Sequence, residues 1–431
     1  MLGVFSIVAK NYLGLANALY KSLKSYNPDV EFIVFVADEL DGMNAEVDFT
    51  LLESKETLPI DAALWNEMTF KYNLTEFCTS IKPHCFKYLF SKYNFEKIVY
   101  FDPDILIYNN ISEIENKLDE YLILLTPHIA EMHEVYNGDV EEHFLFDTGM
   151  YNLGFLGLKR NPKTDLFLIW WENKLINRCY VDKSESLFTD QKWIDFIPCF
   201  FDHNELLISR NLGWNLAPWN YFERKIKMEN NEFVVENRIG ITYRSDKLIF
   251  AHFSGINYRA LTKGEILHVN IMIATRFDDM RQLYTIYGES LKNANFIRFI
   301  DYKYTYDHFE NNIMIKKIYR RLYRRLTELG VKYEHPFSVD NKSFFKSLKK
   351  KKLLVKESNE LEKMSFSNKN GNVFGKQLLI INLATWFIKM LIGIDRYLIL
   401  LRFLPRFSKF ENQIHLFDKK YLNNNIKKSY R

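Results

Sequence analysis

Two aspartates that flank a proline, Asp102 and Asp104, carry the sharpest chemical signal in the sequence. They follow the apolar run at residues 97–101, which has the composition of a buried strand. Ligands in open α/β sheets bind beyond the carboxyl ends of strands, and carboxylates in an apolar setting need a cation or several hydrogen bonds to stay charged. A divalent metal carrying a diphosphate would meet both needs, because hard cations prefer carboxylate and phosphate oxygens. A turn capped by local backbone amides is the alternative interpretation.

A histidine at the end of another predicted strand is the second signal. His252 follows the apolar residues 248–251 and precedes the loop Phe253-Ser-Gly255. Imidazole beside carboxylates suits Mn²⁺ better than Mg²⁺ or Ca²⁺, which favour shells made of oxygen alone. A half-buried histidine that is hydrogen-bonded to the backbone is the structural alternative.

Further polar and small residues have both a functional and a structural interpretation. Asp190 and Gln191 open a predicted helix, where an aspartate either caps the helix or lies with its neighbour over a hydroxyl-rich ligand such as a sugar. Asn152 and Gly154 lie in a strand-like run, where glycine indicates a close approach of backbone or ligand. The histidines and acids at residues 128–147 match no known metal-ligand spacing, which favours a polar loop over a metal cluster.

The elements that must position these residues alternate between short β-rich runs and helical patterns, as in parallel α/β folds. Strands are predicted at residues 3–8, 31–36, 97–101, 105–108, 121–125, 151–158 and 247–251. Helices are predicted at residues 12–25, 75–93, 167–176 and 187–197.

The composition changes after about residue 300, where a helical pattern at residues 315–326 has one apolar face. The opposite face carries Lys316, Lys317, Arg320, Arg321, Arg324 and Arg325. We interpret this basic face as solvated, with a contact to anionic lipid as the alternative. A polar stretch that ends at about Asn372 is interpreted as a linker before apolar C-terminal helices. Their longest uncharged run, residues 377–388, is shorter than the ~20 residues needed to span a bilayer.

Composition excludes several classes of protein. Hydrophobic residues make up 47 % of the 431 residues, which is enough for a sizeable core and excludes a wholly disordered chain. The 58 basic and 54 acidic residues leave a net charge of +4, which is no footprint for nucleic acid. The four cysteines form no C-x-x-C pair, so we expect free thiols in a reducing compartment. The first nine residues lack a positively charged region and are read as a strand rather than a signal peptide.

Taken in order, these pieces resemble bacterial nucleotide-sugar glycosyltransferases of the GT-A fold, and are similar to the family-8 type. The segments that carry the resemblance, over about residues 1–290, are 6–12, 81–83, 98–105, 126–128, 149–155, 189–193, 213–215, 219–220 and 252–255. The resemblance implies an α/β fold with a GT-A (Rossmann-like) mixed sheet flanked by helices at residues 1–295. A helical, basic C-terminal region would occupy residues 296–431, with a linker at about 340–372.

The resemblance also implies roles for individual residues. Asp102, Asp104 and His252 would hold a divalent metal, Mn²⁺ or Mg²⁺, on the donor diphosphate. Contacts with the nucleotide-sugar donor are implied for Ala9, Asn11, Tyr12, Lys82, Asp102, His128, Asn152, Gly154, Ser254 and Gly255. Asp190 and Gln191 are the predicted catalytic residues: Asp190 as general base if configuration inverts, and Gln191 as support for the front face of the sugar if it is retained.

The sequence therefore predicts a metal-dependent, hexosyltransferase-like and retaining glycosyltransferase. It would move a sugar from a nucleotide-diphosphate sugar, such as a UDP-sugar, to a hydroxyl of a glycan, lipid-linked or protein acceptor in bacterial surface polysaccharide or glycoconjugate synthesis. We expect a cytoplasmic location, with the inner face of the membrane, a peripheral membrane contact and a homo-oligomer as open options. A nucleotidyltransferase and a catalytically inactive GT-A scaffold that docks on membranes are the two alternatives.

Overall fold

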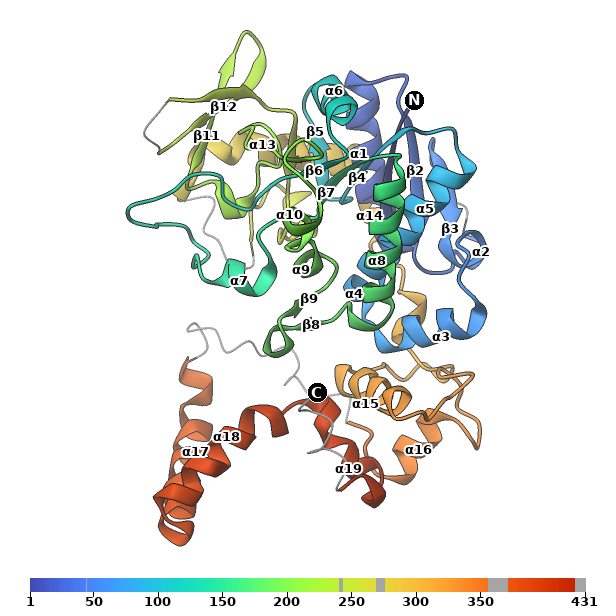
Figure 1. The fold of residues 1–431 in the computed structure, drawn as a ribbon, viewed down its shortest axis with the longest axis vertical. Helices are drawn as coiled ribbons and strands as arrows, with labels where there is room; N and C mark the ends of the chain where they lie inside the picture. The colour runs from blue at the N-terminus through green and yellow to red at the C-terminus, as the bar shows by residue number, and fades with distance from the viewer. Residues whose placement is uncertain (44, 240–242, 269–275, 356–370, 423–431) are drawn as a thin grey trace. The chain divides into compact units, whose positions relative to one another are not determined.

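The computed structural model describes residues 1–43, 45–239, 243–268, 276–355 and 371–422 (Figure 1). The chain forms two compact units. The first comprises Met1–Trp65 and Leu74–Thr305, and the second comprises Asn66–Asn73 and Tyr306–Arg431.

A seven-stranded sheet forms the centre of the first unit, in the order β10-β6-β7-β4-β1-β2-β3. Its strands are β1 (Leu2–Val8), β2 (Glu31–Val36), β3 (Thr50–Glu53), β4 (Lys97–Phe101), β6 (Ile123–Leu125), β7 (Phe155–Lys159) and β10 (Leu206–Ile208). Strand β7 runs antiparallel to β4 and β6, whereas the other neighbouring strands pair in parallel. The predicted α/β fold with a mixed sheet is confirmed.

Helices cover both faces of this sheet. The helices that begin in the first unit are α1 (Leu13–Tyr26), α2 (Ser54–Thr57), α3 (Ala62–Lys71), α4 (Leu74–Ser80), α5 (Lys82–Lys92), α6 (Ser112–Glu120), α7 (Phe144–Thr148), α8 (Pro162–Arg178), α9 (Gln191–Ile194), α10 (Ile197–Phe200), α11 (Tyr258–Leu261), α13 (Arg281–Asn293) and α14 (Phe296–Phe299). Alternate residues of a strand point to opposite faces. Accordingly Val4 lies in one apolar cluster with Leu19 of α1, whereas the ring of Phe5 meets Phe86 of α5 edge-on at 4.8 Å.

Two predicted helices of the first unit differ from the structure. The helix predicted at residues 75–93 is divided into α4 and α5 at Ile81, and a proline occupies the first turn of α5. The single helix predicted at residues 187–197 is wrong. Leu187–Phe188 forms β9, which pairs with β8 (Val181–Asp182), and Thr189 has a φ of 46°. Because positive φ is rare for β-branched residues, the backbone at Thr189 interrupts any regular element before α9 begins.

The second unit is helical and has its own apolar core. Its helices are α15 (Lys317–Glu328), α16 (Phe344–Lys350), α17 (Gly371–Ile392), α18 (Ile394–Phe407) and α19 (Ile414–Phe417). Phe70 at the end of α3, Tyr323 of α15, Phe344 of α16 and Phe417 of α19 lie in one buried cluster. The predicted helical C-terminal region is confirmed. Helix α16 lies within the predicted linker, and residues 356–370 of that linker lie outside the described residues.

The prediction of a solvated basic face on α15 is wrong. Arg320, Arg321 and Arg324 are buried, with exposed fractions of 2–4 %. Arg320 donates hydrogen bonds to the backbone carbonyls of residues 69, 70 and 72, at the C-terminal end of α3. Arg321 and Arg324 form ion pairs with Glu411, at 3.4 Å and 3.2 Å. Three of the six cations on this face therefore lie inside the unit, because carbonyls and a carboxylate from distant segments satisfy their guanidinium groups, whereas Lys317 is exposed.

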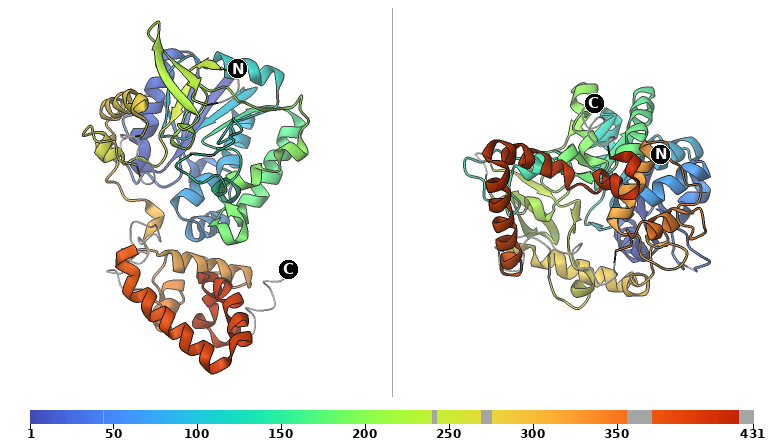
Figure 2. Two further views of the ribbon diagram at one scale, coloured as in Figure 1. Left: turned by 90° about the vertical axis from the view of Figure 1, so that its left-hand side faces the viewer. Right: turned by 90° about the horizontal axis from the view of Figure 1, so that it is seen from below.

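Helices α17 and α18 meet at Gly393, which has a φ of 77° (Figure 2). Within the described part of the chain, none of the helices combines the length and the apolar character that a membrane crossing requires.

Candidate metal centre

Strand β4, in the middle of the sheet, ends at the turn Asp102-Pro-Asp104. The backbone N–H of Ile105 donates to the carbonyl of Asp102 at 3.1 Å. Strand β5 (Ile105–Ile107) then leaves the seven-stranded sheet and pairs antiparallel with β14 (Phe250–His252). This pairing sets His252 opposite Ile105, and the N–H of Phe253 donates to the carbonyl of Asp104 at 2.9 Å. The short β5–β14 ladder therefore brings the distant histidine beside the two acids.

The three side chains converge. Nε2 of His252 lies 3.1 Å from Oδ1 of Asp104 and 3.8 Å from Oδ2 of Asp102. One ligand atom from each residue lies within 4.8 Å of the others, and among the described residues this trio is the group of histidine and carboxylate side chains that could hold one metal ion. Asp102 is 31 % exposed and His252 only 3 %, so the acids can be approached from solution while the imidazole is fixed inside the protein.

Electrostatic interactions within the trio favour the charged forms of Asp104 and His252. Burial alone would raise the pKa of Asp104, but hydrogen bonds from His252 and from the hydroxyl of Tyr258, at 2.9 Å, lower it below its ordinary value. Burial raises the pKa of Asp102, and the nearby charges of Lys82 and His252 offset only part of that rise. Burial opposes the charged form of His252, but the two carboxylates outweigh this effect and raise its pKa. A metal ion would take the place of the imidazole proton, because a histidine that binds a metal is neutral. Two carboxylates and one imidazole then form a donor set that suits Mn²⁺.

The residue before β7, Gly154, has no space for a side chain. A Cβ atom at this position would lie 2.3 Å from Cε1 and 2.7 Å from Nδ1 of His252, so the imidazole packs directly on the glycine backbone. The carbonyl of Gly154 accepts a hydrogen bond from the N–H of Asp102 at 2.8 Å. On another side of the imidazole, the ring of Trp219 meets it edge-on at 5.2 Å. The close approach predicted at Gly154 is confirmed, and the neighbour is the candidate metal ligand.

Replacing Gly154 with alanine is expected to displace His252 and to lower the affinity for Mn²⁺. Shifts of residues that orient a ligand typically cost about 10–100-fold in metal affinity, and calorimetric titration with Mn²⁺ measures the effect. Gly157→Ala is the matched control on β7, because its Cβ would meet Leu124, at 3.2 Å, and not the site. Equal Mn²⁺ affinities for the two variants would contradict the packing argument.

Lys82, at the start of α5, connects Asp190 with the centre. Its Nζ lies 2.6 Å from Oδ2 of Asp190, and both side chains are buried, at 1 % and 3 % exposed. The same Nζ donates to the carbonyl of Leu153 at 2.9 Å and lies 4.1 Å from the ring centre of Tyr100. The hydroxyl of Tyr100 in turn donates to Oδ1 of Asp102. Asp190 is thus linked to the candidate metal ligand Asp102 through the ammonium of Lys82 and the ring and hydroxyl of Tyr100.

Gln191 and Asn152 both hold the backbone that leads to Gly154. Gln191 donates through Nε2 to the carbonyl of Thr148 at 2.8 Å and accepts at Oε1 from the N–H of Leu153 at 3.1 Å. Oδ1 of Asn152 accepts from the N–H of Gly154 at 3.1 Å. The nitrogen and the oxygen of the Gln191 amide therefore both bind the main chain. They fix the backbone between Thr148 and Leu153, just before Gly154.

The three residues predicted after β1 lie at the same edge of the sheet as the acids, because β1 and β4 are parallel neighbours. The N–H of Tyr12 donates to the carbonyl of Ala9 at 2.8 Å. Burial raises the pKa of Tyr12, and the negative charge of Asp104 raises it further. Oδ1 of Asn11 is buried and has no hydrogen-bond partner within the described part of the chain, so it can accept a hydrogen bond from a ligand.

His128 lies beside the centre as a neutral imidazole. Burial lowers its pKa to about 4, and its ring meets that of Trp219 edge-on at 5.4 Å. Trp219 also contacts His252, so its indole touches both imidazoles.

Ser254 and Gly255 continue directly from β14 and His252. Gly255 has a φ of 76°, and a Cβ atom there would lie 2.7 Å from Nε2 of His268. This nitrogen lies 3.0 Å from the carbonyl of Ser254. The loop after His252 is therefore closed by His268, which the sequence analysis did not single out.

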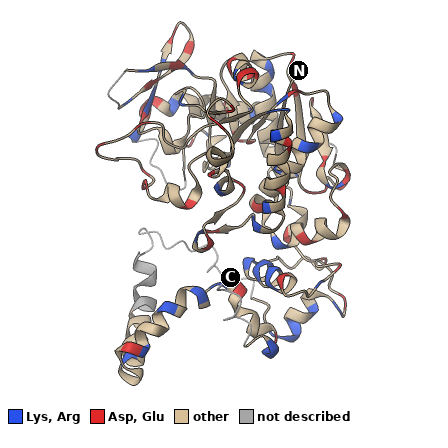
Figure 3. Cartoon of the chain, in the orientation of Figure 1, with Lys and Arg blue, Asp and Glu red and all other residues tan. Residues whose placement is uncertain are grey.

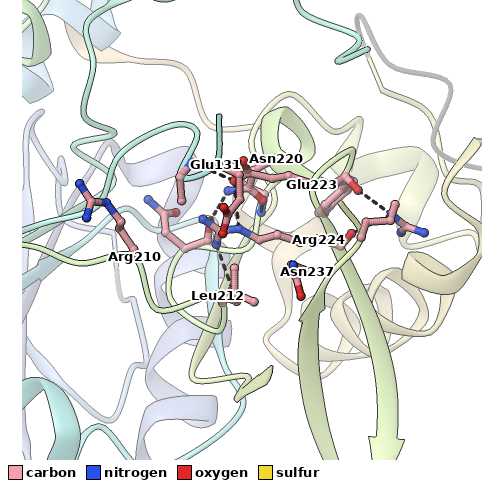
Figure 4. A network of polar contacts seen from close by, with 12 residues as sticks. Glu131, Arg210, Leu212, Asn220, Glu223, Arg224 and Asn237 are labelled. Atoms are coloured by element: carbon pink, nitrogen blue, oxygen red, sulfur yellow. Dashed lines mark hydrogen bonds and ion pairs between the residues drawn. The ribbon is translucent and has the colours of Figure 1, made fainter. Parts of the chain in front are cut away.

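The loop at residues 128–147 is fixed at its start by a buried polar network (Figure 4). The carboxylate of Glu223, fully buried, accepts hydrogen bonds from the N–H groups of Ala130 and Glu131 at 3.1 Å and 3.2 Å. Nε of Arg224 and Nε2 of His133 lie 3.4 Å and 3.5 Å from the same carboxylate. Groups at this end of the loop, the N–H of Glu131 and the imidazole of His133 among them, thus contact the buried carboxylate of Glu223.

Other residues of the site were not found from the sequence. Tyr100 lies two positions before Asp102, and alternate residues of a strand share a face, so its proximity could have been inferred. Tyr258 reaches the acids from α11, and no local pattern indicates this. Asp38 follows β2; its Oδ1 accepts from the N–H of Lys10 at 2.8 Å, and burial raises its pKa to about 6.

No protein-family model and no curated protein match this sequence. The solved structure of the galactosyltransferase LgtC with donor and acceptor sugar analogues is similar over 67 % of this chain and 96 % of that chain, with a TM-score of 0.37 and 14 % identity. The glycosyltransferase GlyE of Streptococcus pneumoniae TIGR4 is similar over 72 % and 68 %, with a TM-score of 0.36 and 15 % identity. Mouse xyloside xylosyltransferase 1 is similar over 50 % and 88 %, with a TM-score of 0.31 and 11 % identity. TM-scores this low carry no argument about chemistry, which rests on the residues of this chain.

Proposed function

We propose that this chain is a metal-dependent glycosyltransferase that moves a sugar from a nucleotide-diphosphate sugar to a hydroxyl. The observation that carries the proposal is the convergence of Asp102, Asp104 and His252 at the end of the central strand. A divalent metal at this position would neutralise the charge that grows on the departing diphosphate. The order of motifs that resembles GT-A enzymes of the family-8 type supports a sugar nucleotide, such as a UDP-sugar, as the source of that diphosphate.

The residues around the trio would orient its ligand atoms. Tyr258 holds one carboxylate oxygen of Asp104, and Tyr100 holds one of Asp102. Each carboxylate therefore keeps its other oxygen for the cation. Asn11 and Tyr12, at the neighbouring strand end, would receive the nucleoside, since β1 and β4 end at the same edge of the sheet.

The surroundings of Asp190 favour retention over inversion of the sugar's configuration. An inverting reaction needs a base within reach of the acceptor hydroxyl, but the carboxylate of Asp190 is buried against the ammonium of Lys82 at 2.6 Å. A carboxylate that is 3 % exposed and paired in this way is out of reach of an acceptor hydroxyl. We assign Asp190 to fixing Lys82 and Gln191 to fixing the segment under the donor sugar, with Asn152, Gly154, His128, Ser254 and Gly255 as donor-side contacts.

A panel of nucleotide sugars tests the proposal. With Mn²⁺ present, at least one donor should release its nucleoside diphosphate, and chelation with EDTA should stop the release. Release of pyrophosphate from a nucleoside triphosphate plus a sugar phosphate would show the alternative nucleotidyltransferase. Absence of both reactions, together with absence of metal-dependent nucleotide binding by calorimetry, would support the alternative of an inactive scaffold.

The acceptor and the setting belong to the same proposal. A glycan, lipid-linked or protein hydroxyl in bacterial surface polysaccharide or glycoconjugate synthesis fits the resemblance, with a cytoplasmic site of action. The proposed catalytic region is residues 1–295. Sedimentation velocity measures whether the chain forms a homo-oligomer.

A further inference from the structure

Helices α17 and α18 expose an unusual amount of apolar surface. We call residues 379–407 the α17–α18 arm. Its exposed large apolar side chains, 41–69 % exposed, are Leu379, Ile380, Ile381, Leu383, Trp386, Phe387, Met390, Leu391, Ile394, Leu398, Ile399, Phe403, Leu404 and Phe407. On α17, Asn382, Thr385 and Lys389 follow one another at intervals of three and four residues, so they form one narrow polar stripe. The other side chains of residues 379–392 are apolar.

The arm is anchored at its end by the core of the second unit. The chain after α18 continues through the 3₁₀ helix η8 (Phe410–Gln413) into α19, where Ile414 and Phe417 are buried in the apolar cluster of that unit. Glu411 of η8 forms the ion pairs with Arg321 and Arg324 on α15. The arm is thus joined at its C-terminal end to a packed core.

Charge on the arm and just after it has one dominant sign. Residues 379–409 contain a single acid, Asp395. The cations of the same segment are Lys389, Arg396, Arg402, Arg406 and Lys409. Figure 3 shows basic positions along α18. Apolar side chains interleaved with cations are typical of helices that lie in the interface of an anionic bilayer.

We propose that the α17–α18 arm inserts into the surface of an anionic lipid bilayer and lies in the plane of its interface. None of the described helices could span a membrane, so the apolar face would enter the acyl region from one side while the cations meet the headgroups. Trp386 and Tyr397 supply the aromatic rings that favour this depth. The inference goes beyond the proposed transfer reaction and does not depend on it.

A second copy of the chain is the competing occupant of this surface. A symmetric dimer through the arm would gather the cations of both copies at one interface, because a two-fold interface is built from the same patch on both subunits. Like charges in such an interface repel one another. Anionic lipid removes this repulsion, which is why we commit to lipid.

Vesicle flotation of the full chain tests the proposal. Binding to vesicles of phosphatidylcholine with 30 % phosphatidylglycerol (roughly the anionic content of a charged membrane) should exceed binding to pure phosphatidylcholine at least tenfold. Leu383→Glu/Leu391→Glu should lower binding to the anionic vesicles by at least tenfold. Leu166→Glu/Ile297→Glu adds the same charge at exposed apolar positions of the first unit and should bind as the unchanged chain does. Binding that is absent, or equal for the two double variants, overturns the proposal.

Tryptophan quenching by brominated phosphatidylcholine locates the contact. Anionic vesicles that contain this lipid should quench the fluorescence of the unchanged chain more than that of Trp386→Phe, because only the former has an indole in the arm. Equal quenching overturns the proposal. Sedimentation velocity without lipid addresses the competing occupant: a dimer that Leu383→Glu/Leu391→Glu dissociates and that persists on vesicles overturns insertion, whereas a monomer supports it.

Discussion

Asp104→Asn is expected to lower the rate of sugar transfer on the order of 10³-fold, since metal stabilisation of a departing diphosphate contributes several kcal/mol. The variant keeps an oxygen that can accept from Tyr258 but loses the negative charge beside His252. Apparent affinity for Mn²⁺ should fall together with the rate. Initial rates with the active donor, and calorimetric titration with Mn²⁺, measure the two effects.

Asp119→Asn is the matched control for that substitution. Asp119 also pairs with a cation, Lys97 at 2.6 Å, but its side chain is 60 % exposed and lies on α6. Transfer by this variant should equal that of the unchanged chain. Full activity of Asp104→Asn, with a folded far-ultraviolet circular dichroism spectrum for both variants, would contradict the assignment of Asp104 as a metal ligand.

Arg320→Met is expected to lower the free energy of unfolding of the second unit by about 3–5 kcal/mol, the usual range for breaking a buried charged network. The guanidinium donates to the carbonyls of residues 69, 70, 72 and 306 and to Oδ1 of Asp307, at 2.7–3.0 Å. Methionine fills much of the volume but leaves these buried acceptors without a donor. Hydrogen exchange of peptides from α15, together with urea denaturation, measures the loss.

Lys317→Met tests whether the loss comes from those contacts. Lys317 is an exposed cation on the same helix, and surface substitutions usually change stability by less than about 0.5 kcal/mol. If both variants exchanged at the same rate, the network around Arg320 would not stabilise the unit as argued.

The main strands of the sheet could be predicted from the sequence, because the local residue pattern of each strand agrees with its burial in the fold. Residues 98–101 are apolar throughout, as expected of a strand covered on both faces, and Asp102 marks where that strand ends. The partners of the acids were less accessible. His252 could be singled out as a residue at a strand end, but its position beside Asp104 depends on the β5–β14 pairing, which no local pattern encodes. The ion pair of Lys82 with Asp190 joins segments about a hundred positions apart in the same way.

The second unit shows the opposite case, in which a clear pattern was misread. The apolar and basic positions of α15 follow the pattern of an amphipathic helix whose basic face is exposed to solvent. The structure buries three of the six basic side chains, because the end of α3 and Glu411 supply acceptors to Arg320, Arg321 and Arg324. The hydropathy of a helix does not report whether distant segments offer acceptors. Tertiary context therefore decided between a solvated and a buried arginine.

The distance in sequence between the acid turn and strand β14 has a consequence for synthesis. During translation the chain emerges with Asp102 and Asp104 long before it has a partner for β5, since residues 250–252 supply that partner. Until then the site lacks both its imidazole and the β5–β14 ladder that positions it. A nascent chain that stalls before this point would carry the two aspartates without the histidine, so under the proposed function the site could bind a metal ion only after residues 250–252 are made.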